Sequence, residues 1–172
     1  MNLQDNDFVL FGVPERFAQD GAALDARWKE LQREAHPDRF AAQGAAAQRV
    51  AMQWSVRINE AYKRLKDPLK RAAYLCELRG APIDAERNTA MPPQFLLEQM
   101  EWREALEDAS SGADVDAVDA RLREARARTL ADIEDLLDTE GDAKSAAEQV
   151  RALMFLDRFA HDVEARFEQL GQ

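Results

Sequence analysis

A repeated spacing of three and four between apolar residues most constrains how this chain can fold. One run in the second half of the sequence contains Val115, Val118, Leu122, Ala125, Thr129, Ile133 and Leu136. This spacing places the side chains on one face of an α-helix. Only 7 of the 172 residues are glycine and 6 are proline, so helices can continue for long stretches before they are broken. The sequence therefore predicts an all-α protein.

Capping and helix-breaking residues divide the first half of this pattern. A short helix before Gly12 is followed by a second, at about 22–36, which Asp20 can cap. Pro37 ends the second helix, since the residue before a proline disfavours the α region. The alanine-rich stretch 40–49 is predicted to be a loop.

A third helix is expected to run from this loop to about Lys66. Asp67 can then cap a fourth helix that begins at Pro68. The apolar stripe predicted for the third helix consists of Val50, Trp54, Ile58, Ala61 and Leu65.

The stretch "RGAPIDAERNTAMPPQ" is rich in turn residues and is the best candidate for a domain boundary. We expect a first domain at 1–76, a connector at 77–92 and a second domain at 93–172. Three amphipathic helices with short breaks predict an antiparallel three-helix bundle in the second domain. The last of them carries Val150, Leu153, Leu156, Ala160, Val163, Phe167 and Leu170.

Charge is distributed unevenly along the chain. Residues 1–77 contain 12 Lys and Arg against 11 Asp and Glu, whereas residues 78–172 contain 11 against 22. An acidic second half argues against nucleic acid as a partner, because phosphates require clustered cations. The acidic surface also has a simpler interpretation, in which it mainly serves solubility.

The sequence further predicts a cytoplasmic protein that needs no cofactor. One cysteine excludes a disulfide framework, and two histidines with it are too few for the usual four-ligand zinc site. The N-terminus lacks the pattern of a signal peptide. No apolar run approaches the roughly 20 residues that span a bilayer, so no membrane association is expected.

The tripeptide at 36–38 interrupts the helical pattern with His36, Pro37 and Asp38. It can be a simple turn, a catalytic pair or a surface that another protein binds. No nucleophile, metal cluster or glycine-rich phosphate loop accompanies it at a recognisable spacing, which disfavours catalysis. Because proline fixes φ, the turn can present both polar side chains with little ordering cost on binding.

Cations surround this turn. Lys29 and Arg33 are four residues apart and share a helical face, although a solvated face is the simpler interpretation of that spacing. Arg39 extends the positive surface beyond the turn.

A second candidate surface lies in "QFLLEQMEWREAL". The bundle core needs only one face of this helix, the face with Phe95, Trp102 and Leu106. The other apolar residues are either more core or an exposed binding patch. The candidate patch consists of Leu96, Leu97, Met100 and Phe155, with a rim of Glu101, Arg103 and Glu104, although bundle core is the simpler interpretation of the spacing.

The tripeptide and the later "INEAYKRLKDPLKRAAYL" together resemble the J-domain family, whose members carry His-Pro-Asp between their second and third helices. The resemblance extends over essentially the whole chain to the HscB family, the bacterial J-proteins of iron–sulfur cluster assembly. The further stretches that carry it are "LFGVP", "HPDRFAAQGAAAQ", "FLLEQMEWREAL" and "RALMFLDRF". It implies an L-shaped molecule with an N-terminal J-domain and a C-terminal three-helix bundle.

The resemblance also implies two partners and no enzymatic activity of the chain itself. The DnaK-type chaperone HscA would dock on Lys29, Arg33, His36, Pro37, Asp38 and Arg39, and its ATPase would be stimulated. The iron–sulfur scaffold IscU would bind the patch and rim on the bundle. Two alternatives stay open: a nucleic-acid-binding helical protein that uses the Arg33–Arg39 patch, and a general J-protein that serves unfolded clients.

Overall fold

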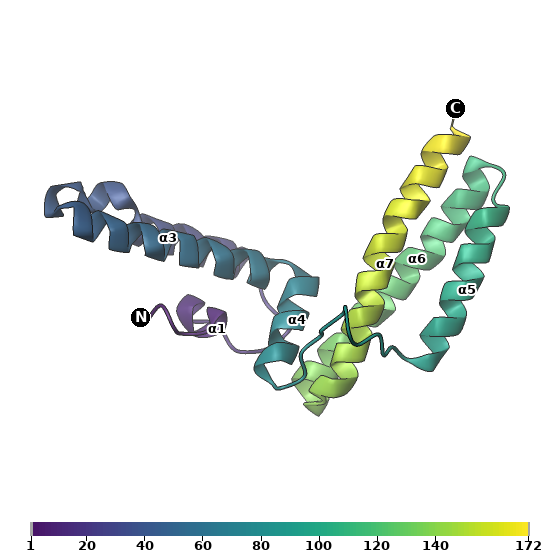
Figure 1. The fold of residues 1–172 in the computed structure, drawn as a ribbon, viewed down its shortest axis with the longest axis horizontal. Helices are drawn as coiled ribbons and strands as arrows, with labels where there is room; N and C mark the ends of the chain where they lie inside the picture. Colours follow the sequence, from purple (N-terminus) through teal and green to yellow (C-terminus); the bar gives the residue numbers. More distant parts are fainter. Residues whose placement is uncertain (1, 172) are drawn as a thin grey trace. The chain divides into compact units, whose positions relative to one another are not determined.

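The computed structural model describes residues 2–171, and these form only helices, turns and loops (Figure 1). The all-α prediction is confirmed. The chain divides into two compact units, Met1–Leu75 and Cys76–Gln172, which are described separately below. Within residues 2–171, no helix has the length and apolar character needed to cross a bilayer.

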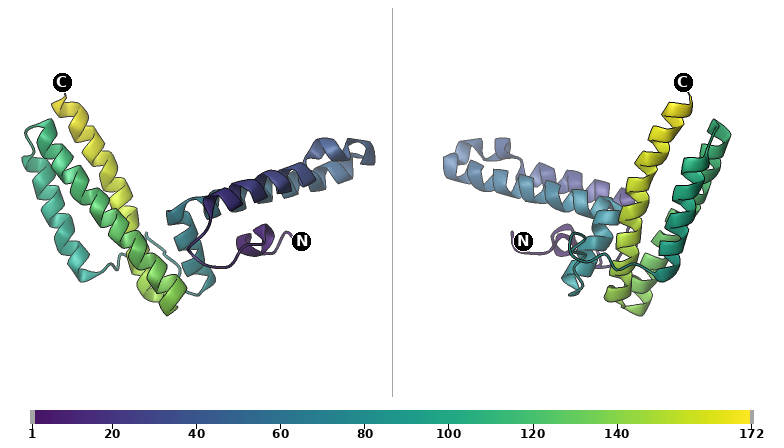
Figure 2. Two further views of the ribbon diagram at one scale, coloured as in Figure 1. Left: turned by 180° about the vertical axis from the view of Figure 1, so that it is seen from behind. Right: turned by 45° about the vertical axis from the view of Figure 1, so that its right-hand side comes forward.

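The first unit is built on a hairpin of two long helices, α2 (Gly21–Ala35) and α3 (Ala45–Lys66), which lie side by side in all views (Figure 2). The short helix α1 (Asp7–Phe11) packs against this hairpin, and α4 (Pro68–Leu78) follows directly after α3. This is the J-domain arrangement that the sequence predicts. The largest buried side chains of the unit are Phe8, Leu10, Phe11, Leu24, Leu31, Ile58, Leu65 and Leu75.

The predicted helix ends in this unit follow from local chemistry. The carboxylate of Asp20 accepts hydrogen bonds from the backbone N–H groups of Ala22 and Ala23, which caps α2. Gly12 ends α1 in the left-handed region, with a φ of 65° that a residue with a Cβ rarely adopts. α2 ends at Ala35, before Pro37, as predicted.

Two predictions for the tip of the hairpin are wrong. Residues Pro37–Gln43 form a 3-10 helix, η1, and α3 already begins at Ala45, so nearly all of the loop predicted at 40–49 is helical. Proline supplies the φ angle with which such a turn begins. Val50 is 51% exposed instead of buried, because it lines an open pocket at this tip.

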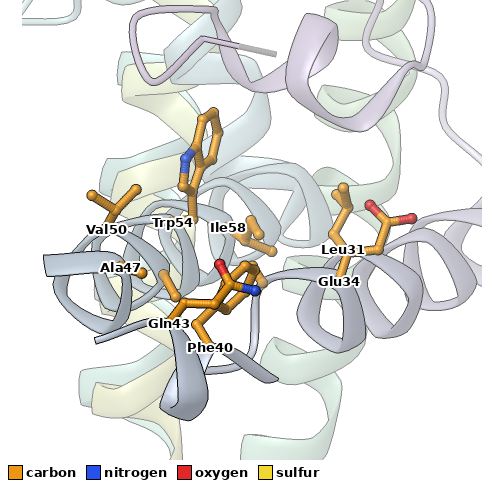
Figure 3. A pocket seen from close by; sticks show the side chains of 10 residues that line it. Leu31, Glu34, Phe40, Gln43, Ala47, Val50, Trp54 and Ile58 are labelled. Carbon is orange, nitrogen blue, oxygen red and sulfur yellow. The ribbon is translucent and has the colours of Figure 1, made fainter. Parts of the chain in front are cut away.

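Small side chains leave an open apolar pocket of about 510 Å³ at this tip (Figure 3). Trp54 and Phe40 stand at its sides, while Ala47 and Ala51 are too short to fill it. The predicted stripe of α3 is therefore core only from Ile58 onward to Leu65, and Ala51 is buried in place of Val50.

A buried carboxylate connects α1 with α3 and α4. The side chain of Asp7 is fully buried; its Oδ2 accepts from Arg64 Nε at 2.6 Å, and its Oδ1 lies 2.8 Å from Nη1 of Arg57. The backbone N–H of Asp7 donates to the hydroxyl of Tyr74 at 3.0 Å. The hydrogen bond that Arg64 donates to Asp7 raises the pKa of Arg64. Two guanidinium groups, one of them still 38% exposed, thus neutralise the charge of the buried Asp7 carboxylate.

We predict that Asp7→Asn destabilises the first unit by about 3–5 kcal/mol, because it leaves two cations without their counter-charge. Urea unfolding followed by tryptophan fluorescence measures this in a Trp102→Phe background, where both remaining tryptophans, Trp28 and Trp54, belong to the first unit. The control Asp38→Asn makes the same chemical change on a side chain that is 91% exposed, and should shift stability by less than about 0.5 kcal/mol. Equal stability of the two variants would contradict a central role for the ion cluster.

The second unit contains the predicted three-helix bundle. Its helices are α5 (Pro93–Asp108), α6 (Gly112–Glu134) and α7 (Ala143–Leu170), and they pack lengthwise against one another (Figure 1). α5 begins at Pro93, where the second domain is predicted to begin, and the short breaks between the helices fall after Asp108 and near Gly141. The buried residues that form its main core are Phe95, Trp102, Leu106, Ala109, Val115, Val118, Leu122, Ala125, Ala152, Phe155, Leu156, Phe159 and Val163.

A π-helical turn, η2 (Asp135–Glu140), changes the register at the end of α6. A strict α-helical period places Leu136 in the core, but Leu137 is buried at 3% exposure and Leu136 is only half-buried. The wider turn of a π-helix shifts the inward position by one residue. Near the end of α7, Phe167 is likewise 44% exposed, contrary to the predicted stripe.

The connector is fixed to the bundle rather than free. The buried guanidinium of Arg151, on α7, donates to the carbonyls of Ile83 at 3.0 Å and Ala90 at 3.1 Å, with a longer bond to Pro82. Arg79 donates to the carbonyl of Leu137 at 2.6 Å. A segment with few apolar side chains is thus ordered through its backbone carbonyls.

Cys76 is fully buried in this unit, and burial raises the pKa of its thiol to about 11, against the smaller opposing effect of Arg79 and Arg151. We predict that iodoacetamide does not modify Cys76 in the native protein between pH 7 and 8.5, because the thiol stays neutral and out of reach. Intact-mass spectrometry measures the adduct. Full modification should appear in urea, and rapid modification of the native protein would contradict the burial of Cys76.

Candidate functional site

The tripeptide at 36–38 forms an ordered, exposed turn between α2 and η1. His36 is extended, with φ −60° and ψ 128°, and Pro37 begins η1. The imidazole Nδ1 of His36 accepts a hydrogen bond from the backbone N–H of Asp38 at 3.2 Å. The imidazole is 56% exposed and the Asp38 carboxylate 91% exposed. The turn therefore presents both polar groups to solvent, as the sequence predicts.

The three cations near the turn differ in their surroundings. Lys29 and Arg33 are exposed on one side of α2, as their spacing predicts. The guanidinium of Arg39 instead donates to the carbonyl of Arg33 at 3.2 Å, close to the end of α2. Arg39 thus compensates a carbonyl that the helix leaves without an internal partner, and helps to hold the turn.

A shallow basic groove runs from α2 to the turn. One hollow is lined by Trp28, Lys29, Gln32, Arg33 and Asn59, and a second by Gln32, Arg33, His36 and Arg39. The two hollows share Gln32 and Arg33, and no acidic side chain lines either of them. The lining of the groove thus combines positive charge with the indole of Trp28 and the side-chain amides of Gln32 and Asn59.

A network of side-chain hydrogen bonds joins α2 to α3 at this groove, and the sequence analysis did not predict it. The Asn59 Oδ1 accepts from the Trp28 indole N–H at 2.9 Å and from the Gln32 amide at 2.7 Å. The Ser55 hydroxyl donates to the Gln32 Oε1 at 3.0 Å. These bonds join residues of α2 to residues of α3 that are 23 to 31 positions away in the chain. The sequence offers no signal for this pairing, because each polar residue stands alone and belongs to no local pattern.

A second set of bonds supports the same groove from the side. Trp28 stacks on Tyr62, with ring centroids 4.7 Å apart. The Tyr62 hydroxyl donates to Asp25 at 2.6 Å, and Lys66 donates to the same carboxylate at 2.7 Å. The bond from Lys66, followed by that from Tyr62, lowers the pKa of Asp25. The surface around Lys29 and Arg33 therefore lies on a well-ordered hairpin.

The patch predicted on α5 is exposed in its central residues. Leu96 is 48% exposed, Leu97 65% and Met100 69%. Phe95 and Trp102, on the other face of α5, are buried. Three neighbouring apolar side chains that the core does not use form a candidate binding surface.

The prediction that Phe155 belongs to this exposed patch is wrong. Phe155 is 7% exposed and packs against Phe95 and Phe159, with ring centroids 5.7 Å apart in each pair. The guanidinium carbon of Arg103 lies 5.2 Å from the Phe155 ring centroid. The core-facing side of α7 is wider than a single stripe, so Phe155 fills the core beneath Arg103.

Ion pairs position the acidic residues around the patch. Glu101 lies 3.7 Å from Arg121 of α6, and Glu98 accepts from Arg128 at 2.8 Å. Arg103 and Glu104 are exposed. The apolar patch is thus bordered by charges of both signs, an arrangement common at protein interfaces.

Comparisons with known proteins agree with this two-unit arrangement. The co-chaperone protein HscB homolog of Burkholderia multivorans is 54% identical over 173 residues, which cover 99% of this chain and 98% of the relative. A family profile described as HSCB C-terminal oligomerisation domain matches residues 91–164.

Solved structures match the fold over nearly the full length. The chaperone HscB from Vibrio cholerae aligns with a TM-score of 0.80 and 36% identity, covering 96% of this chain and 99% of that one. Human co-chaperone protein HscB aligns with a TM-score of 0.84 and 26% identity, covering 96% and 84%. The fold and the turn define an all-α co-chaperone with a J-domain. The chain belongs to the HscB family of co-chaperones.

Proposed function

We propose that this protein stimulates the ATPase of the DnaK-type chaperone HscA and delivers the iron–sulfur scaffold IscU to it. The protein would act in the cytoplasm as an activator of its partner and carry out no bond-breaking step itself. The observation that carries this proposal is the ordered, exposed turn at His36–Asp38, which continues the basic groove of α2.

Electrostatics supports the first half of the proposal. The groove contains Lys29 and Arg33 without an acidic neighbour in its lining, so it attracts an acidic surface and speeds association with it. The rigid turn then fixes the orientation of the bound partner, because proline and the His36–Asp38 hydrogen bond leave little freedom to lose.

Apolar burial supports the second half. Leu96, Leu97 and Met100 expose apolar surface that a folded partner can remove from water. One short patch on a helix suits a defined partner surface better than a long extended peptide. Because the two surfaces belong to one chain, binding at the second site becomes effectively intramolecular.

We predict that Lys29→Glu with Arg33→Glu slows association with HscA and removes much of its salt dependence, because the steering charges are reversed. Stopped-flow association and ATPase stimulation, each at low and high salt, measure this. The matched control Lys63→Glu with Lys70→Glu changes the net charge equally at exposed positions outside the groove. IscU binding should be unchanged in both variants. Loss of IscU binding by a folded Lys29/Arg33 variant would contradict two separate sites.

We predict that Leu96→Ala, Leu97→Ala and Met100→Ala together weaken IscU binding at least tenfold, as expected when about 1–2 kcal/mol or more is lost at an interface centre. Isothermal calorimetry measures the affinity. ATPase stimulation in the absence of IscU should be unchanged.

Thermal unfolding then separates a binding role from a core role. Truncation of exposed side chains should cost the fold little, whereas buried ones cost about 2–5 kcal/mol each. The control Met52→Ala with Val56→Ala removes similar side chains that are 53% and 51% exposed on α3. A strongly destabilised triple variant that still binds IscU would place the scaffold site elsewhere.

A further inference from the structure

The open pocket at the tip of the hairpin has the size and lining of a small-molecule site (Figure 3). Its volume of about 510 Å³ lies within the roughly 300–1,000 Å³ range of ligand pockets in proteins. Leu31, Ala51 and Ile58 form the buried part of its lining, each at most 4% exposed. A hollow with such a lining is poorly solvated, so an apolar body gains free energy by entering it.

Two aromatic side chains at the sides of this pocket favour an aromatic body over an aliphatic one. Trp54 comes from α3 and Phe40 from η1, and both are only partly buried. Aromatic rings in contact gain free energy beyond the burial of their area. A ring in the pocket also covers the apolar surface of Val50, which is 51% exposed in the free chain.

This pocket is separate from the basic groove. The two share no lining residue, and no residue of the tripeptide at 36–38 lines the pocket. On α2 the pocket uses Leu31 and Glu34, which the helical period places on the side away from Lys29 and Arg33. A ligand in the pocket therefore leaves the groove open.

The charge at the mouth of the pocket is negative. Among the described residues that line it, Glu34 is the one charged side chain, and it is exposed. No ion pair within residues 2–171 involves Glu34.

Glu34 also lies in the last turn of α2, where the helix dipole favours a cation over a carboxylate. A side chain that opposes its local preference in this way is typical of a functional position. The carboxylate and the end of the helix both attract a positive group.

We propose that the pocket at the hairpin tip binds a small arylalkylamine, a molecule with an aromatic ring and a protonated amino group. The ring fills the hollow that Trp54 and Phe40 border, and the ammonium group pairs with Glu34. The side-chain amide oxygen of Gln43 offers a second acceptor at the pocket. An anion of the same shape is rejected, because its carboxylate would meet Glu34. This inference does not depend on the proposed function.

Three probes of similar shape test the ligand class on the full chain: 2-phenylethylammonium, the neutral 2-phenylethanol and the anionic phenylacetate. Carbon-13 methyl NMR follows Ala47, Val50, Ala51 and Ile58, which line the pocket. We expect saturable shifts confined to these methyl groups, with a dissociation constant for 2-phenylethylammonium on the order of 1 mM or below. The alcohol should bind a few-fold more weakly, and phenylacetate weakest of the three.

Two variants test the site. Ala47→Leu places three more carbons in the pocket and should weaken binding of 2-phenylethylammonium at least tenfold, whereas Ala46→Leu makes the same change at an exposed position outside it. Glu34→Gln should weaken binding of the amine roughly twofold to fivefold, the range of an exposed ion pair, and leave that of the alcohol unchanged. Its matched control is Glu30→Gln, also on α2 but outside the pocket.

Each contrary outcome overturns a defined part of the proposal. Shifts that spread over the surface without saturation, or unchanged binding by Ala47→Leu, would overturn the site. Equal affinity for the amine and phenylacetate, or unchanged affinity of Glu34→Gln for the amine, would overturn the ligand class. Shifts of the same methyl groups on dilution of the chain alone would show that a second copy occupies the pocket, which also overturns it. If Ala47→Leu does not fold, Glu34→Gln and the three probes still decide.

Discussion

The buried carboxylate of Asp7 is the interaction on which the first unit depends. It lies between Arg57 and Arg64 of α3, while its own backbone N–H reaches Tyr74 of α4. A helix of five residues is too short to be stable by itself, so α1 needs these bonds and its buried Phe8 and Phe11 to remain on the hairpin. With α1 in place, α2 and α3 are covered on one side, and their other side is free to carry the groove.

Local chemistry made much of the fold predictable. The ends of α1, α2 and α5 follow from Gly12, Asp20, Pro37 and Pro93, each of which acts within a few residues of its own position. The exposed turn follows from the same kind of reasoning, whereas the free apolar face of α5 is expected only from the family resemblance, since the spacing alone favours core. What failed depends on distant neighbours. Val50 is exposed because it lines an open pocket between α3 and the end of α2, and Phe155 is buried because α5 and α7 meet there. The bond between Gln32 and Asn59 joins positions 27 residues apart and has no counterpart in any local pattern.

The two candidate surfaces use different physical forces. The groove beside His36 combines positive charge with polar groups fixed by hydrogen bonds, so its interactions depend on salt and on geometry. The patch on α5 consists of apolar side chains, whose burial depends little on salt. A change in salt concentration can therefore alter the affinity at the groove without an equal change in the affinity at the patch.

The hydrogen bonds of Arg151 affect how readily a protease can cleave the connector. The connector is rich in exposed polar residues, and such segments are preferred sites of cleavage. A protease must draw a segment into its active site in an extended form. Here the carbonyls of Ile83 and Ala90 are bound to Arg151, and the N–H groups of Arg87 and Asn88 close a turn on Asp84. Cleavage therefore requires local unfolding first, so one buried guanidinium protects the stretch between α4 and α5.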